Sequence, residues 1–197
     1  MKTFHLWAFA VVLLPLAALG CANNVPPQEN AKATEARIKA NLEKLDPEDR
    51  ELAEEQKYCA VETTNRLGSM GKPIKMMIED EPVFLCCKGC EKTAKQDPKQ
   101  TLARVENLKV QAALAKLDPA DRKLAEQQKF CANDTESRLG SMGAPVKVMV
   151  KDQPVFVCCG SCRKAVLKDP DKTLAAVKKL KAANASAAEE RNEETHE

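Results

Sequence analysis

A short apolar segment that ends in three closely spaced cysteines occurs twice in this chain, and it constrains the fold more than any other feature. The two copies are residues 82–90, PVFLCCKGC, and residues 154–162, PVFVCCGSC. One more cysteine lies upstream of each copy, Cys59 and Cys131. Thiols between the end of a strand and the start of a helix, at this spacing, are typical of a soft-metal site.

The two copies belong to a tandem duplication with a period of 72 residues. Residues 45–109 and 117–181 align without a gap, and 38 of the 65 positions are identical. Two copies are too few for a solenoid, which needs about three repeats or more. We therefore predict two similar modules, residues 42–112 and 113–182, that each fold and bind on their own.

Each module is predicted to be α+β, in the order helix, loop, β-hairpin, cysteine knuckle, helix. Asp-Pro pairs open the first helices at 46–47 and 118–119, because Asp favours the N-cap and Pro the first helical position. The β-rich segments 74–78 and 146–150 predict hairpins that turn at 80–82 and 152–154 and return along 83–86 and 155–158. Helices are then expected from Cys90 to about residue 96 and again from the next Asp-Pro pair, the second leading into the next module.

The segment LGSMG occurs unchanged at 67–71 and at 139–143. Two glycines permit a positive φ and a close approach of two backbone segments. We expect this turn to pack near the cysteine knuckle of its module.

The composition argues against a nucleic-acid partner and against acid–base catalysis. The 31 basic and 29 acidic residues are mixed along the chain rather than gathered into a basic stripe. The two histidines, His5 and His196, lie near the ends of the chain, outside the predicted modules. We expect no enzymatic activity. Modules this short bury little apolar surface, so stabilisation by a metal ion or a disulfide is physically plausible.

The ends of the chain are predicted to lie outside the modules. Lys2 and the apolar run 6–19 predict a secretory signal over residues 1–21, because the run is too short for an ordinary transmembrane helix. Residues 18–21, ALGC, resemble a bacterial lipobox, which implies lipidation of Cys21 and anchoring to membrane lipid in the cell envelope or periplasm. The alternative is an ordinary signal peptide with Cys21 as a stray thiol. We expect a flexible tether over 22–41 and a disordered tail over 183–197.

Residues 83–90, VFLCCKGC, followed by Lys92 and by Asp97-Pro98, resemble the heavy-metal-associated YHS/TRASH-type domain, and the resemblance covers both repeats. It implies a small treble-clef-like or zinc-ribbon-like module for metal trafficking, resistance or sensing, with a metal efflux or sensing system as partner. It places the family's cysteines at Cys59, Cys86 and Cys90, and at Cys131, Cys158 and Cys162. The family often has a small residue where this chain has Cys87 and Cys159.

The residues themselves predict about one soft metal ion, Zn²⁺ or Cu⁺, in each repeat. Cys87 and Cys90 form a C-x2-C pair and Cys86 and Cys90 a C-x3-C pair, so either pair with Cys59 supplies three thiolates. Cys159 is the counterpart of Cys87, and each of the two is either a fourth ligand or a spare. Met70 and Met142 are candidate auxiliary ligands, although packing is the favoured explanation of both. The helix that begins at Cys90 is expected to lower the pKa of the nearby thiols.

Two other functions are compatible with the cysteines. Small exported domains are often stapled by disulfides, and four cysteines allow two bridges in three pairings. The C-x2-C pairs also suggest a thiol–disulfide oxidoreductase. Against that, each module offers one hairpin and no βαβ unit, and three thiols in five residues would compete for one mixed disulfide.

Overall fold

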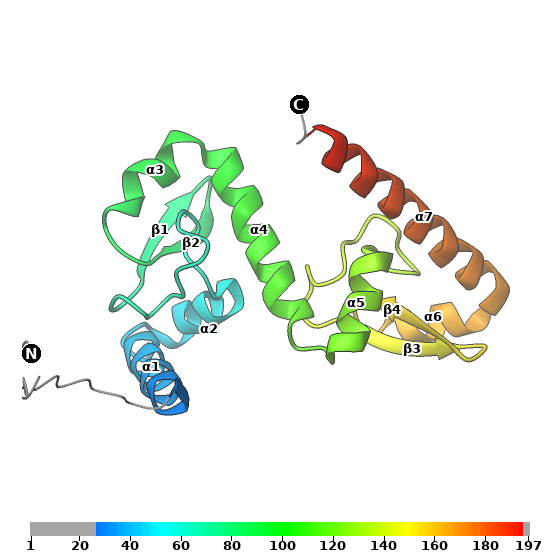
Figure 1. The fold of residues 1–197 in the computed structure, drawn as a ribbon, viewed down its shortest axis with the longest axis horizontal. Helices are drawn as coiled ribbons and strands as arrows, with labels where there is room; N and C mark the ends of the chain where they lie inside the picture. The colour runs from blue at the N-terminus through cyan, green and yellow to red at the C-terminus, as the bar shows by residue number, and fades with distance from the viewer. Residues whose placement is uncertain (1–26, 195–197) are drawn as a thin grey trace, which may run out of the picture.

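The computed structural model describes residues 27–194, which form seven helices and two separate antiparallel hairpins, so the predicted α+β class is confirmed (Figure 1). The first half contains α1 (Pro27–Leu42), α2 (Pro47–Gln56), β1 (Ile74–Ile78), β2 (Glu81–Leu85) and α3 (Cys90–Gln96). The long helix α4 (Pro98–Leu114) leads into the second half. There the same order returns as α5 (Pro119–Gln128), β3 (Val146–Val150), β4 (Gln153–Val157), α6 (Cys162–Lys168) and α7 (Pro170–Glu194).

Four helices begin at a proline that follows an aspartate, as the sequence predicts. The side chain of Asp97 caps α4 by accepting a hydrogen bond from the backbone N–H of Gln100 at 2.9 Å. Asp169 accepts one from the N–H of Lys172 at 3.1 Å at the start of α7. Asp46 and Asp118 make no such bond, so at these two helices the fixed φ of proline sets the start without a side-chain cap.

The two hairpins have the same register and the same tight turn. Ile74 pairs with Leu85 and Ile78 with Glu81 in the first, and Val146 pairs with Val157 in the second. The turn lies one residue earlier than expected, because Glu79 and Asp80 both have positive φ, 48° and 66°. Two positive values in a two-residue loop give the hairpin turn that matches the twist of the strands.

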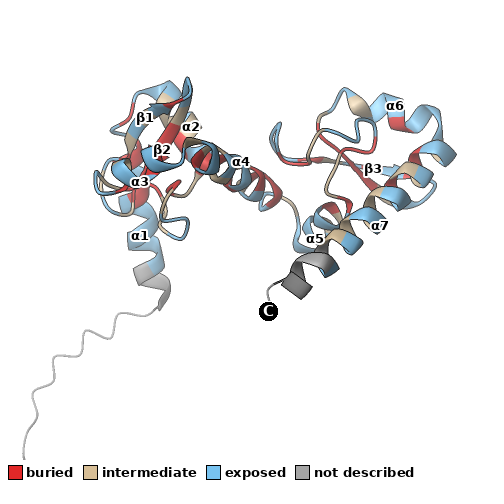
Figure 2. Ribbon diagram, turned by 90° about the horizontal axis from the view of Figure 1, so that it is seen from above, coloured by how far each residue is buried: buried red, intermediate tan, exposed pale blue. Residues whose placement is uncertain are grey.

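Helix α4 belongs to the cores of both halves. Leu102 and Val105 pack in the first core, whereas Val110 and Leu114 pack in the second. At 3.6 residues per turn the two pairs point about 130° apart around the helix axis. Figure 2 shows the buried stretches of α4 continuing between the two halves of the molecule. The predicted module boundary at residues 112 and 113 therefore falls inside a shared helix.

Helix α1 occupies much of the segment that was expected to be a tether. It is polar along most of its length, but Ile38 and Leu42 are buried in the first core. Gly68 packs directly on it: with φ at +87°, a Cβ at this glycine would lie 2.7 Å from the backbone oxygen of Ile38. The side chain of Asn41 donates a hydrogen bond to the backbone oxygen of Gly68 at 2.8 Å. The LGSMG turn thus packs on α1 through its first glycine, while Leu67 of the same turn lies in the core that also holds the cysteines.

At the other end, α7 continues to Glu194 through most of the predicted disordered tail. Within residues 27–194, no helix has the length and apolar character needed to cross a bilayer. The predicted signal, the lipobox cysteine Cys21, the start of the predicted tether and His196 lie outside the described residues.

Candidate metal centre

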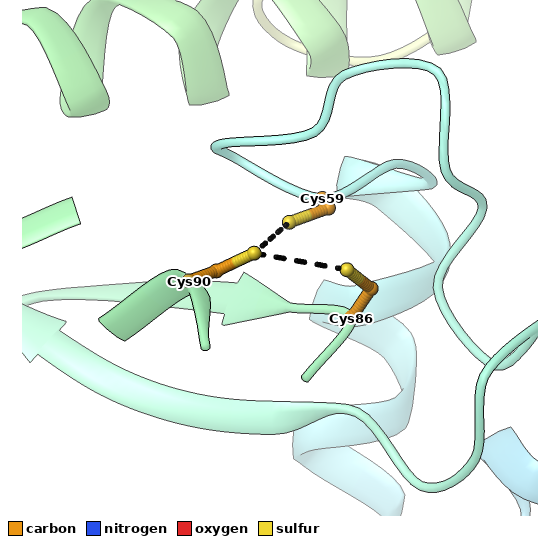
Figure 3. Close-up of side chains that lie close together, drawn as sticks. All are labelled: Cys59, Cys86 and Cys90. Atoms are coloured by element: carbon orange, nitrogen blue, oxygen red, sulfur yellow. Dashed lines mark hydrogen bonds between the residues drawn. The ribbon is translucent and has the colours of Figure 1, made fainter. Parts of the chain in front are cut away.

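Three cysteines from different elements meet in the first half, and we call them the first triad. Cys59 lies in the loop after α2, Cys86 directly follows β2, and Cys90 is the first residue of α3. The Sγ atom of Cys90 is 3.8 Å from that of Cys59 and 3.8 Å from that of Cys86, and all three Sγ atoms lie within 4.8 Å of one another. Figure 3 shows the three side chains pointing toward a common centre. All three are buried, with exposures of 6% or less.

The same constellation recurs in the second half, where Cys131, Cys158 and Cys162 form the second triad. Their Sγ atoms also lie within 4.8 Å of one another, and Cys158 is 3.8 Å from Cys162. Cys131 is fully buried and Cys158 is 4% exposed, whereas Cys162 is half-buried. The six cysteines matched to the family by resemblance are therefore the six that the fold gathers into two groups.

A buried glutamine in each half holds together the two segments that carry the first two thiols. The side chain of Gln56 donates hydrogen bonds to the backbone oxygens of Tyr58 at 2.7 Å and Phe84 at 2.6 Å, and its oxygen accepts one from the N–H of Phe84 at 2.9 Å. Tyr58 immediately precedes Cys59, and Phe84 lies two residues before Cys86. Gln128 makes the same three bonds in the second half, with Phe130 and Phe156.

Sequence analysis did not single out either glutamine. The sequence does carry one signal for them. The same residue, glutamine, stands at the last position of the first helix in both repeats, and this helix has few apolar residues. Both side chains are completely buried, and a buried amide of this kind is tolerated only because its hydrogen bonds are made.

Two thiols of the first triad, those of Cys86 and Cys90, favour the neutral form when no cation is present. Burial raises the pKa of Cys86 to about 11, and hydrogen bonding and charge repulsion from Cys59 act in the same direction. Burial and the nearby Cys59 also raise the pKa of Cys90. The expected lowering by the start of α3 is therefore wrong for these two residues, because the loss of water and the crowding of sulfurs outweigh it.

Backbone donors stabilise the first sulfur of each triad. The N–H groups of Val61 and Glu62 donate to the Sγ of Cys59 at 3.5 and 3.4 Å. In the second half, burial raises the pKa of Cys131, but hydrogen bonds from the backbone of Cys158, Asp134 and Asn133 outweigh burial and leave this pKa below its ordinary value. Burial raises the pKa of Cys158 and of Cys162. A cation that replaces the protons would remove the repulsion among these sulfurs.

The remaining cysteine of each half lies at the outer edge of its triad, and we call Cys87 and Cys159 the rim thiols. Both are half-buried, as is Cys162. The Sγ of Cys87 is 4.0 Å from that of Cys90, while the Sγ of Cys159 is 3.9 Å from Cys158 and 3.7 Å from Cys162. A backbone hydrogen bond from Gly89 lowers the pKa of Cys87. Hydrogen bonding with the Ser161 hydroxyl, 2.9 Å away, lowers the pKa of Cys159 to about 7.

The two methionines considered as auxiliary ligands are exposed, whereas most of the triad cysteines are buried. Met70 and Met142 are each 62% exposed on the LGSMG turns, and these turns pack on α1 and α4 through Gly68 and Gly140. The thiols, by contrast, are supplied by the loop after the first helix of each half and by the strand-to-helix junction.

Each triad is chemically suited to a soft cation. A Zn–S bond of about 2.3 Å in a tetrahedral site separates neighbouring sulfurs by about 3.8 Å. This is the separation found between Cys90 and its two partners in the first triad and between Cys158 and Cys162 in the second. Two cysteine groups, each able to hold one metal ion, are thus present in the described residues. Comparison of the chain with family models, curated proteins and solved structures gives no match.

Proposed function

We propose that this chain is a metal-binding protein of the cell envelope that holds one soft ion, Zn²⁺ or Cu⁺, in each half for sequestration, trafficking or resistance. The observation that carries this proposal is the convergence of three mostly buried thiols, twice, from positions 72 residues apart. Burial raises the pKa of Cys86 and Cys90, and a cation that takes the place of their protons would offset the cost of burying thiolates. Thiolate-only sites select soft ions.

The number of thiols in each triad favours metal over disulfides. All eight cysteines of the described residues are free. One cation engages all three sulfurs of a triad at once, whereas disulfides would have to divide the four thiols of each half into two separate pairs. The treble-clef-like assignment of each half to the YHS/TRASH type forms part of the same proposal and is supported by the order of hairpin, cysteine knuckle and helix.

Export and lipid anchoring complete the proposal. They are supported by the apolar run 6–19 and by the ALGC sequence that ends at Cys21. A Cys21→Ser variant is expected to leave the membrane fraction of the producing cells, while the unaltered chain stays in it. Equal distribution of the two proteins between membrane and soluble fractions would contradict the anchor and leave the metal centres untouched.

Elemental analysis of reduced, purified protein, with a thiol count on the same sample, tests the metal-binding proposal. We expect about two equivalents of soft metal per chain and, after denaturation and metal removal, eight titratable thiols in the two halves. A folded protein that carries no metal and has lost four hydrogens per half in non-reducing mass spectrometry would instead indicate disulfide-stapled modules.

A further inference from the structure

The eight thiols are not equally accessible, and this inequality has a consequence for how metal enters and leaves. In the first half the triad is 6% exposed or less, whereas the rim thiol Cys87 is half-exposed. Val83, Phe84 and Leu85 of β2, all buried, lead directly into this site. An incoming ligand therefore reaches a cation in the triad most directly from the side where Cys87 lies.

The rim thiols are also placed differently from the triad members. The Sγ of Cys87 lies 4.0 Å from Cys90, but Cys87 is not part of the group whose sulfurs all lie within 4.8 Å of one another. Cys159 lies within 3.9 Å of Cys158 and Cys162, yet it too is outside the triad that includes Cys131. Each rim sulfur thus touches one side of its triad, where a fourth ligand of a tetrahedral site would stand.

We propose that Cys87 and Cys159 are exchangeable fourth ligands through which metal is passed to a thiol-bearing acceptor, while the triads hold it during the exchange. This inference rests on the metal-binding function proposed above. In the exchange, a sulfur of the acceptor forms a bond to the metal as the bond from the rim sulfur breaks. The proton of the incoming thiol passes to the released rim thiolate, so that neither the metal nor any sulfur changes oxidation state.

The geometry predicts that loss of a triad thiol and loss of a rim thiol have different effects on metal binding. Loss of a triad member removes a buried ligand whose place no water can easily fill, because the site is closed by α3, β2 and the loop after α2. Loss of a rim thiol opens a coordination position at the surface, which water can occupy and leave quickly. Compared with the unaltered chain, the rim variants should therefore bind metal more weakly and release it faster.

The test compares the full chain with Cys87→Ser/Cys159→Ser and with Cys86→Ser/Cys158→Ser, all reduced and loaded with Zn²⁺. Transfer to the chromogenic chelator pyridylazoresorcinol is followed by stopped flow, and Co²⁺ in place of Zn²⁺ reports the number of bound sulfurs. For the rim variant we expect two equivalents of metal, one fewer sulfur per Co²⁺, and faster transfer. Its affinity should be lower by at least about 10-fold, the smallest loss that even a change in an outer contact produces. The Cys86→Ser/Cys158→Ser protein should not retain metal.

Three results would overturn the inference. They are an unchanged Co²⁺ spectrum in the rim variant, a transfer rate equal to or below that of the unaltered chain, or loss of both metal equivalents as in the triad variant. The alanine pair Cys87→Ala/Cys159→Ala, with folding checked by circular dichroism, removes any ligation by the serine hydroxyl. Failure of the unaltered chain to bind Zn²⁺ or Co²⁺ would count against the proposed function itself, a different outcome from all three.

Discussion

The two halves of this molecule share a backbone framework but surround their thiols differently. Both use a buried glutamine to tie the first cysteine loop to the returning strand, and both join an aspartate of the first helix to a lysine of the hairpin, Asp49 to Lys75 and Asp121 to Lys147. Beside the thiols, however, Lys88-Gly89 in the first half is replaced by Gly160-Ser161 in the second. The framework that gathers the sulfurs is kept, while the groups that tune them have diverged.

The divergence makes the second centre the more open and more polar of the two. The side chain of Asn133 donates to the Sγ of Cys162 at 3.5 Å, at the position where the first half has Val61. Cys162 is half-buried, whereas its counterpart Cys90 is 6% exposed. Donors to a metal-bound sulfur and solvent access both alter how strongly that sulfur binds its ion. The duplication therefore provides two sites that differ mainly in their surroundings.

The largest expected effect is the loss of one metal ion when one triad is broken. Cys86→Ser should reduce bound Zn²⁺ from about two equivalents to one, and Cys158→Ser should do the same in the other half, with an affinity loss at the altered site beyond the roughly 100-fold typical of outer contacts. Elemental analysis after dialysis measures this. Met70→Leu is the matched control and should keep both equivalents. Loss of both ions from either single variant would show that the halves bind as one unit.

The next effect concerns the buried glutamines. Gln56→Leu removes this partner from the backbone N–H of Phe84 and from the backbone oxygen of Tyr58, while the oxygen of Phe84 keeps the N–H of Ala60 at 3.3 Å. The free energy of unfolding should therefore fall by about 2–4 kcal/mol. Gln128→Leu should cost a similar amount. Urea unfolding followed by circular dichroism measures both, and Tyr58, the one tyrosine of the chain, reports on the first half in the near ultraviolet.

Gln127→Leu makes the same chemical change at the exposed neighbour of Gln128. It should shift the free energy of unfolding by less than about 0.5 kcal/mol. Equal losses at Gln127 and Gln128 would show that the buried hydrogen bonds do not stabilise the loop and the strand.

A smaller effect appears when the metal-free protein is made alkaline. Burial raises the pKa of Cys86 to about 11 from its ordinary value of 9.0, so the folded chain keeps a proton that the unfolded chain has already lost. The contribution to stability is complete below pH 9 and is lost as the pH rises through about 11. Its size is on the order of 2 kcal/mol. Urea unfolding at pH 8, 9, 10 and 11 should show a shallower decline in Cys86→Ala, and identical declines would contradict the shift.

The smallest effect distinguishes the rim thiols. In metal-free protein at pH 7, Cys159 is about half ionised because its pKa is about 7, so iodoacetamide should modify it before the other cysteines. Ser161→Gly, which introduces the residue of the first half, should slow that modification several-fold by removing the 2.9 Å hydroxyl contact. Peptide mapping by mass spectrometry reads out each site, and Gly89→Ser provides the reciprocal change at Cys87. An order of labelling unaffected by either exchange would rule out the hydroxyl as the cause.

The parts of this fold that the sequence predicts are those with strong local signals. Asp-Pro pairs set the starts of α2, α4, α5 and α7, and the alternating β-rich segments define both hairpins. The cysteine spacing predicts that the thiols at the junction of strand and helix lie close together, because a strand and a helix joined by four residues leave few alternatives.

The remainder depends on contacts between distant segments. Helix α1 is polar and gains its place from the packing of Ile38 on Gly68, thirty residues later. The role of Gln56 appears only when its helix meets β2. The choice of triad members over rim thiols follows from which sulfurs face the core, and two adjacent cysteines, Cys86 and Cys87, give no local signal for that.

The contact between a helix and the glycine turn that follows it sets α7 apart from α1 and α4. Ile38 on α1 and Val110 on α4 each lie beneath a glycine of the next LGSMG turn. On α7 the equivalent position, 72 residues after Val110, is Ala182, and the position equivalent to Leu114 is Ser186, whose hydroxyl donates to the backbone oxygen of Ala182 at 3.2 Å. Helix α7 thus carries small side chains where the two earlier helices carry the bulky ones that support a glycine turn.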